Sequence, residues 1–319
     1  MDLEFEKPIK EIENKITELK ELSIKSKVNF TSEITELEKR CQKQIEEIYS
    51  NLTSWQILQI ARHPKRPVLQ DYIPLIFNNF IELHGDRVYG DDRALIGGFA
   101  TLDHQKLMLI GHNKGKTVEE NVERNFGMAK PEGYRKALRL MKIAEKFNIP
   151  IVTFIDTQGA YPGLEAEKRG QAEAIASNLT EMAQIEVPII TLVTGEGGSG
   201  GAIGIGVGDV ILMLSFSIYS VISPEGCASI LWRDAKFAPD AAEALQITAP
   251  ALLKLKVINE IVKEPIGSAH RNYGETALNI KKCLIKYLQI LKSQPVKKLL
   301  RRRFELYAQM GNIKSKQGL

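Results

Sequence analysis

An apolar segment followed directly by a glycine-rich segment is the feature of this sequence that most constrains its fold. Residues 189–194 are apolar or β-branched and follow Pro188, which is typical of a buried strand. The next seven residues, 195–201, contain five glycines. Glycine is favoured where φ is positive or where another group must approach the main chain closely. We therefore expect this backbone to form a binding surface, with consecutive N–H groups at the start of a helix stabilising an oxyanion.

Two known motifs also match parts of this glycine segment. Gly197-x-Ser199-x-Gly201 has the form of the nucleophile elbow of serine hydrolases, but Ser199 has no identifiable histidine partner in the sequence. Gly195-x-Gly197-x-x-Gly200 has the form of a dinucleotide fingerprint, but no acidic residue closing a second strand about 20 residues later is evident. The glycines could also serve only to let a helix pack tightly on a strand. Among these interpretations the backbone oxyanion site is favoured.

The composition limits the class of protein and its partners. The 319 residues are 44% hydrophobic and 26% charged, which is ordinary for a globular protein with a sizeable core. The net charge of +4 is small for this length and lies mostly near the C-terminus, so nucleic acid is not an expected partner. No apolar run of signal-peptide or membrane-span length occurs, so we expect an unsecreted protein without membrane association.

Cysteine and histidine spacing gives no sign of a metal site. The three cysteines, Cys41, Cys227 and Cys283, are scattered, which excludes a Cys-x-x-Cys zinc site and fits a reducing compartment. The five histidines show no His-x-x-x-His or similar spacing. We therefore expect no metal in this chain, and we expect each histidine to be a solvated or capping residue.

Residues 1–52 are predicted to form a helical arm. Two sets of apolar residues recur at helical spacing: Ile9, Ile12, Ile16 and Leu19, then Leu37, Cys41, Ile45 and Ile48. Because these stripes are narrow and the outer positions are charged, we interpret the pair as an antiparallel assembly element. Two further helices are expected after the arm, one capped by Ser54 and one capped by Asp71 that carries apolar residues as far as Phe80.

The remainder, residues 53–319 with a core at about 93–265, is predicted to be an α/β domain with C-terminal helices. A hairpin comes first, and strand, loop and helix then alternate, which is typical of parallel strands. The strand 151–155 ends in a second glycine-bearing loop, 156–163. Because the carboxyl ends of parallel strands share one edge of a sheet, both glycine loops should face one site. The expected strands are 94–101, 107–111, 151–155, 189–194, 210–214, 219–223 and 257–262, and the expected helices begin near 131, 165, 224, 239, 250 and 275.

Two other polar segments could be either solvent-exposed structure or sites that bind an anion. Residues 111–117 resemble a phosphate-binding loop, but the first glycine is one residue too close to Gly115-Lys116-Thr117, so we interpret them as a polar loop that could face phosphate. The basic segment 297–303 is expected to be a solvated helix face, with an anion-binding patch as the alternative.

Six motifs together resemble the α subunit of the carboxyltransferase of multi-subunit acetyl-CoA carboxylase, over essentially the whole chain. They are Ala61-Arg62-His63-Pro64, His84-Gly85-Asp86-Arg87, Arg124-Asn125-Phe126-Gly127-Met128, and residues 131–141, 195–201 and 223–228. This resemblance implies a crotonase-like superhelix of ββα units. It also implies carboxyl transfer from carboxybiotin, carried on a separate biotin carboxyl carrier protein, to acetyl-CoA, which gives malonyl-CoA for fatty-acid synthesis.

The resemblance also implies partners and site residues. The expected partners are a zinc-bearing β subunit, as two α and two β, together with the carrier protein and biotin carboxylase. The backbone amides of Gly200 and Gly201 would form the oxyanion hole for the biotin ureido group, and the β subunit would supply the hole for the thioester enolate. Gly159, Ala160, Gly197 and Gly198 are candidate substrate-binding residues. Because the ureido nitrogen can take the proton, no general base is needed from this chain, and no covalently bound cofactor is expected in it.

Three points stay open on the sequence: the effect of one departure from the family pattern, an alternative function and the compartment. Where the family usually has Asp-Thr-Pro-Gly, this chain has Asp156-Thr157-Gln158-Gly159, which frees one φ angle and adds a donor, so we expect altered loop rigidity with activity retained. A crotonase-like hydrolase that uses Ser199 is the alternative function. The compartment is expected to be a bacterial cytoplasm or a plastid stroma.

Overall fold

One mixed sheet of eight strands organises the computed structural model, which describes residues 3–26 and 28–311. The strand order is β1-β2-β3-β4-β5-β6-β8, and the short β7 also pairs with β5. The first two pairings are antiparallel and the others are parallel, so the predicted hairpin and parallel strands are confirmed. The strands are β1 Asn78–Glu82, β2 Leu95–Leu102, β3 Gln105–His112, β4 Ile151–Thr157, β5 Ile189–Gly198, β6 Val210–Leu214, β7 Ile218–Ser220 and β8 Glu260–Val262.

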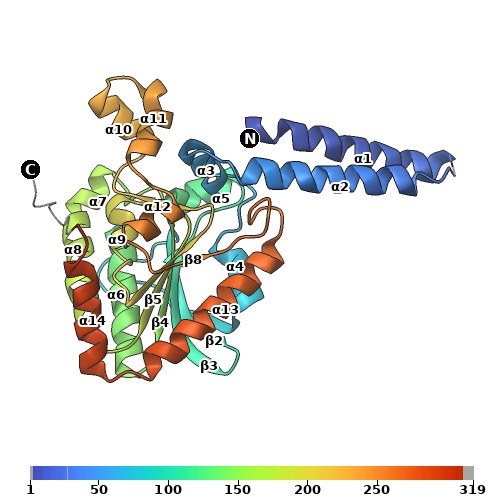
Figure 1. Ribbon diagram of the computed structural model, residues 1–319. Helices are drawn as coiled ribbons and strands as arrows, with labels where there is room; N and C mark the ends of the chain where they lie inside the picture. The colour runs from blue at the N-terminus through green and yellow to red at the C-terminus, as the bar shows by residue number, and fades with distance from the viewer. Residues whose placement is uncertain (1–2, 27, 312–319) are drawn as a thin grey trace, which may run out of the picture.

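Helices cover both faces of the sheet (Figure 1). On one face, α6 (Pro131–Lys146), α8 (Gln171–Gln184) and α14 (Val296–Ala308) pack over a core that includes Leu140, Met182 and Ile155. On the other face, α4 (Leu69–Ile76) and α13 (Tyr273–Lys292) pack over a core that includes Tyr72 and Leu284. Because both faces are covered, the central strands are buried on both sides instead of on one, and every residue of β4 and β5 is buried.

The arm projects from this body as a pair of antiparallel helices, α1 (Lys7–Ser26) and α2 (Thr31–Tyr49) (Figure 1). Their apolar stripes, which include Ile12, Ile16, Cys41 and Ile45, bury one another. Most of the stripe residues expected from the sequence therefore lie inside the hairpin, as an element that packs on itself requires.

The base of the arm is joined to the body through a buried carboxylate. Glu6 is 2% exposed and accepts hydrogen bonds from Tyr49 Oη at 2.6 Å and from Arg271 at 3.2 Å. Burial by itself would raise the pKa of Glu6, but hydrogen bonding to His270 and Tyr49 and the charge of Arg271 together lower it to about 2. A charged, paired Glu6 thus fixes where the arm leaves the body.

Shorter helices complete the chain. They are α3 Ser54–Ala61, α5 Val118–Glu123, α7 Leu164–Lys168, α9 Ser199–Ile203, α10 Pro224–Leu231, α11 Ala238–Ala244 and α12 Ala249–Lys254, with 3-10 turns at Glu4–Glu6, Asn125–Gly127 and Ala235–Phe237. Helices α10 and α11 stand away from the sheet at one end of the molecule (Figure 1). None of the helices in the described part of the chain is long and apolar enough to cross a membrane.

Several predicted helix boundaries were wrong, each for a local reason. Thr53, not Ser54, caps α3, because the Thr53 side chain accepts from the Gln56 amide while Ser54 instead hydrogen-bonds Glu243. Helix α4 begins at Leu69 and ends at Ile76; Phe77 is its C-cap residue, and Phe80 belongs to β1. The helix predicted for 165–184 is split between α7 and α8, because Gly170 adopts a φ of +82° that ends one helix before the next begins.

The predicted ends of two strands and one residue of the basic segment also differ from the structure. The strands expected at 219–223 and 257–262 are shorter, at Ile218–Ser220 and Glu260–Val262. In the basic segment, Lys297, Lys298, Arg301 and Arg302 are exposed, as a solvated helix face requires. Arg303 differs, because it is 1% exposed. Its guanidinium donates to both carboxylate oxygens of Asp209, at 2.9 and 2.8 Å, which holds α14 against the sheet.

Candidate functional site

The two glycine loops predicted to face one site meet at the carboxyl ends of β4 and β5. A Cβ added to Gly201 would lie 2.3 Å from the carbonyl carbon of Gly159 and 2.6 Å from the nitrogen of Ala160. A Cβ on Gly198 would lie 2.0 Å from the carbonyl oxygen of Gln158. All three distances are far below van der Waals contact, so only glycine lets the two backbones approach this closely.

The glycine segment is a strand for longer than the sequence predicts. Strand β5 runs to Gly198 because Gly197 pairs with Thr157 of β4 and with Tyr219 of β7. A Cβ on Gly197 would lie 2.7 Å from the Tyr219 ring. Gly197 and Gly198 are therefore buried between neighbouring elements, and a packing role accounts for both of them.

Gly200 and Gly201 lie in the first turn of α9, at the end of this strand. The first amides of a helix have no acceptor within the helix. Over residues 3–26 and 28–311, neither of these two amides donates to a backbone or side-chain acceptor outside α9. Gly200 is also open, since a Cβ there would meet only Ile175 Cδ1, at 3.5 Å. The two consecutive N–H groups are thus free to bind an anionic oxygen.

Ser199 is exposed and has a positive φ of 49°. A serine on a sharp turn between strand and helix resembles a nucleophile elbow, but such a serine needs a histidine as its base. No histidine within the described residues hydrogen-bonds Ser199, so the serine–histidine pair of a hydrolase is not formed in this structure.

The predicted nature of the histidines was partly wrong. His112, at the end of β3, is 1% exposed, and neither ring nitrogen has a hydrogen-bond partner among the described residues. Burial, with a contribution from the charge of Lys114, lowers the pKa of His112 to about 3, so the ring is neutral at physiological pH. The His270 side chain is 6% exposed, and its ring stacks on His63 at 4.3 Å between centroids. Neither His112 nor His270 is solvated.

Exposed apolar side chains surround the glycine segment. Val221 follows Ser220, which pairs with Gly198 across β7 and β5, and Val221 is 79% exposed. Leu164, directly after the loop 156–163, is 69% exposed, and Ile203 at the end of α9 is 39% exposed. All three belong to, or directly follow, elements that adjoin the two glycine loops.

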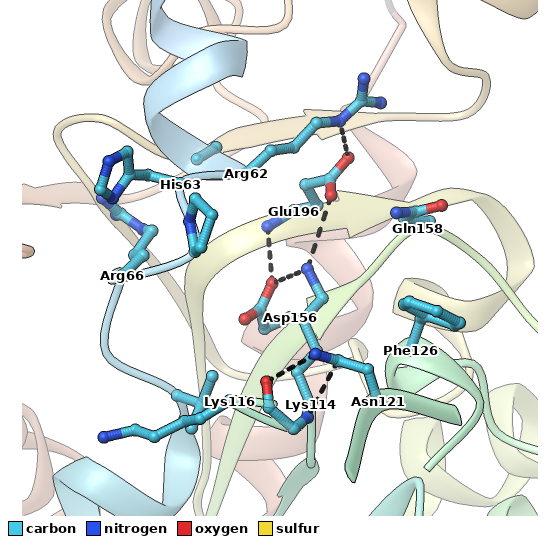
Figure 2. A pocket seen from close by; sticks show the side chains of 14 residues that line it. Arg62, His63, Arg66, Lys114, Lys116, Asn121, Phe126, Asp156, Gln158 and Glu196 are labelled. Atoms are coloured by element: carbon cyan, nitrogen blue, oxygen red, sulfur yellow. Dashed lines mark hydrogen bonds and ion pairs between the residues drawn. The ribbon is translucent and has the colours of Figure 1, made fainter. Parts of the chain in front are cut away.

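Beside the glycine loops lies a charged network that the sequence analysis did not identify (Figure 2). Lys114 Nζ is 2.6 Å from Asp156 Oδ1 and 3.5 Å from Glu196 Oε1. Asp156 also accepts from the Glu196 amide at 3.0 Å. Burial would lower the pKa of Lys114, but the two carboxylates outweigh it and raise the pKa, so the lysine stays charged. The 111–117 loop therefore directs Lys114 at carboxylates of its own chain instead of at phosphate.

Arg62, at the end of α3, extends this network to α10. Its Nε donates to Glu196 at 2.7 Å and its Nη1 to Glu225 at 2.5 Å. The network borders a cavity of about 230 Å³ at the carboxyl edge of the sheet. Figure 2 shows Phe126 and Gln158 on the same wall of this cavity, and Phe126 adopts a positive φ of 54°. Gln158, the departure from the family pattern, is exposed there.

A sequence signal for these charges exists only in part. Lys114 follows β3, and Asp156 and Glu196 lie near the carboxyl ends of β4 and β5, which neighbouring parallel strands bring together. Arg62 is 134 positions from Glu196, and nothing in the sequence pairs them. Among the described residues, no group of three His, Cys, Asp or Glu side chains is placed to hold a metal ion.

Comparison with known proteins shows the family. Residues 2–311 match the model of a family described as acetyl co-enzyme A carboxylase carboxyltransferase-like. The chain belongs to this family. The acetyl-coenzyme A carboxylase carboxyl transferase subunit alpha of Geobacter metallireducens is 55% identical over 98% of this chain and 98% of its own length. The corresponding protein of Vibrio cholerae is 55% identical over 95% of this chain and 96% of its own length.

Solved structures show that this carboxyltransferase-family chain has the crotonase-like fold expected from the resemblance. A transcarboxylase 12S structure has a TM-score of 0.59 at 16% identity, covering 74% of this chain and 45% of that one. The β subunit of Pseudomonas aeruginosa geranyl-CoA carboxylase has a TM-score of 0.57 at 18% identity, covering 77% of this chain and 46% of that one. A chain of a Pseudomonas malonate decarboxylase hetero-tetramer has a TM-score of 0.57 at 15% identity, over 68% of this chain and 86% of its own.

Proposed function

We propose that this chain is the α subunit of the acetyl-CoA carboxylase carboxyltransferase. In this role it takes part in transferring the carboxyl group of carboxybiotin, presented on the biotin carboxyl carrier protein, to acetyl-CoA, which yields malonyl-CoA. The observation that carries the proposal is the pair of acceptor-free amides of Gly200 and Gly201, held at the end of β5 in a chain of this family.

Carboxyl transfer develops negative charge on an oxygen in each of its two halves. When CO2 leaves carboxybiotin, charge develops on the ureido oxygen, and Gly200 and Gly201 donate to that oxygen. The ureido nitrogen then takes a proton from the methyl group of acetyl-CoA, and the resulting carbanion bonds to CO2. Gly159 and Ala160 hold the Gly201 peptide in place by direct backbone contact. No protein base is needed in this scheme, which fits the finding that no histidine of the described residues hydrogen-bonds Ser199.

The site is completed by a second protein in this proposal. Its amides share α9 with the exposed Ile203, and the exposed Val221 and Leu164 directly follow β7 and the loop 156–163. A partner that covers these side chains would both exclude water and bring a second oxyanion site opposite the first. The partner is the zinc-bearing β subunit, in a complex of two α and two β, and the arm, residues 1–52, contributes to its assembly. Biotin carboxylase supplies the carboxylated carrier. The bacterial origin of the named relatives supports a bacterial cytoplasm as the compartment.

Reconstitution tests this proposal. The chain is purified alone and after co-expression with a β subunit, and both preparations are assayed for biotin-dependent malonyl-CoA decarboxylation, the reverse of carboxyl transfer. Activity should appear only in the complex. Turnover by the rigorously purified single chain would contradict the two-subunit site. A serine-directed fluorophosphonate should leave Ser199 unlabelled, whereas labelling with loss of activity would favour the hydrolase alternative.

A further inference from the structure

The helix that carries the proposed oxyanion amides is too short to hold its orientation relative to the sheet without contacts from other elements. α9 has five residues, Ser199–Ile203, and a single helical turn is not stable in isolation. Contact between Gly201 and Gly159 holds its beginning. The segment 204–208, which leads away from its other end, must therefore be held by groups outside α9.

Asn178 of α8 holds the first residue of this segment. Its side chain is fully buried, and Nδ2 donates to the carbonyl oxygen of Gly204 at 2.9 Å and to that of Tyr134 at 3.0 Å. Gly204 in turn donates its amide to Gly200 O at 3.0 Å. The Oδ1 atom of Asn178 has no hydrogen-bond partner among the described residues, which costs stability. Packing alone therefore does not account for an asparagine here, because a leucine would fill a similar volume without an unpaired oxygen.

Tyr307 of α14 holds the end of the same segment. Its hydroxyl accepts from the Gly208 amide at 2.8 Å and lies 3.1 Å from Gly206 O and 3.2 Å from Gly208 O, so it can donate to either carbonyl. Burial raises the pKa of Tyr307, which keeps the phenol protonated and able to donate. The bidentate pair between Arg303 and Asp209 fixes the helix from which Tyr307 reaches the segment.

We propose that Asn178 and Tyr307 are positioning residues for carboxyl transfer. Acting on the backbone of 204–208 from two different helices, they set the direction of α9 and so aim the amides of Gly200 and Gly201 at the ureido oxygen. Neither side chain touches the reacting groups. This inference rests on the proposed function of those amides, and it gives the C-terminal helix a part in the reaction.

Tyr307→Phe in the assembled complex is the first test. It removes one hydroxyl and keeps the ring, so kcat should fall about threefold to tenfold while the KM for acetyl-CoA stays within about twofold, because only the aim of the amides changes. Tyr287→Phe is the matched control, since the Tyr287 hydroxyl also makes a hydrogen bond, to Glu260 at 2.6 Å, but on α13 across the sheet. Equal kcat in the two variants, at similar thermal stability, would overturn the proposal.

Hydrogen exchange gives a readout that does not depend on activity. In the Tyr307→Phe complex, exchange should become faster at residues 199–204 as well as at 205–208, and Asn178→Leu should act on the same residues. Faster exchange confined to 205–208, with kcat unchanged, contradicts the proposal. If instead a Gly201 variant that folds and assembles retains full activity, the proposed oxyanion role of the amides is wrong. That outcome is distinct from one in which only the positioning role of Asn178 and Tyr307 fails.

Discussion

The α-carbon of Gly201 is packed directly on the peptide of Gly159. Residue 201 therefore contributes an amide to the proposed oxyanion site and also forms the contact between the two loops. Gly200 differs, because the space beside its α-carbon is open up to Ile175. A side chain added at residue 201 would therefore disturb the loop contact, whereas one added at residue 200 would not. Substitutions at the two positions can be compared for this reason.

Gly201→Val should abolish most carboxyltransferase activity. A β-branched side chain cannot fit against Gly159, and the amide would be displaced. Loss of one oxyanion donor costs about 2.7 to 4 kcal/mol, which is on the order of a hundredfold to a thousandfold in rate. Ser199→Ala keeps every main-chain N–H, so its activity should fall less than about tenfold. Both variants are measured as assembled complexes.

The control for this series is Gly200→Ala, which the open space should accommodate. Its thermal unfolding temperature should match that of the unchanged protein. Gly201→Val should unfold at a lower temperature, because the added side chain pushes the two loops apart. If Ser199→Ala proves as damaging to activity as Gly201→Val, the site works through its serine and the oxyanion interpretation is wrong.

Lys114→Met should destabilise the chain strongly. The substitution leaves the carboxylate of Asp156, which is 6% exposed, without its lysine partner. Removing one partner of a buried ion pair costs about 3 to 5 kcal/mol. Adding Asp156→Asn to Lys114→Met should restore part of this stability, because it removes the unpaired charge. Urea unfolding of the three proteins measures both effects, and a double variant no more stable than the single one would count against the argument.

Shortening the arm should impair assembly without unfolding the body. Lys20 and Glu38 face one another across the hairpin at 2.7 Å, so residues 20–38 can be replaced by a short glycine-serine turn. This design keeps Leu3 and Tyr49, which share a buried cluster with Ile60 of α3 and would leave it exposed if the whole arm were deleted. Size-exclusion chromatography with the β subunit tests the prediction, and a complex of unchanged size and activity would refute the assembly role.

Stability should decline as the pH falls from about 6.5 to 4, and His63 should contribute to this. Burial, helped by the nearby His270, lowers the pKa of His63 from 6.5 to about 4. The unfolded chain therefore takes up a proton in this range before the folded chain does, so the contribution of His63 is present above pH 6.5 and is lost as the pH falls towards 4.

Asn in place of His63 should reduce this pH dependence. Urea unfolding at pH 7 and at pH 5 is compared for the unchanged protein, for His63→Asn and for His104→Asn, whose histidine lies at the exposed tip of the β2–β3 hairpin. A smaller loss of stability at pH 5 is expected for His63→Asn alone. The same loss in all three proteins would show that another group dominates.

Much of the architecture could be predicted because its signals are local. The apolar run at 189–194, the hairpin around Asp103 and the heptad-like stripes of the arm each determine a strand or a helix through neighbouring residues. The alternation of strand and helix then placed the loops after β4 and β5 at one edge, and the structure confirms that they touch. The end of β5 at Gly198, the division of one predicted helix at Gly170 and the strand β1 were misjudged, because pairing with other strands or a single φ angle decides the outcome there.

The sequence by itself determined the family, the sheet and the glycine segment, because each is encoded in contiguous residues. The tertiary structure alone decided which glycines are packed and which is open, since that depends on the distance between two loops about 40 residues apart. It also decided the partners of Lys114, Arg62, Asn178 and Tyr307, which come from elements distant in the chain. Charge pairing and burial depend on which residues lie close in space. The sequence pattern does not indicate which side chains distant in the chain will contact each other in the folded protein.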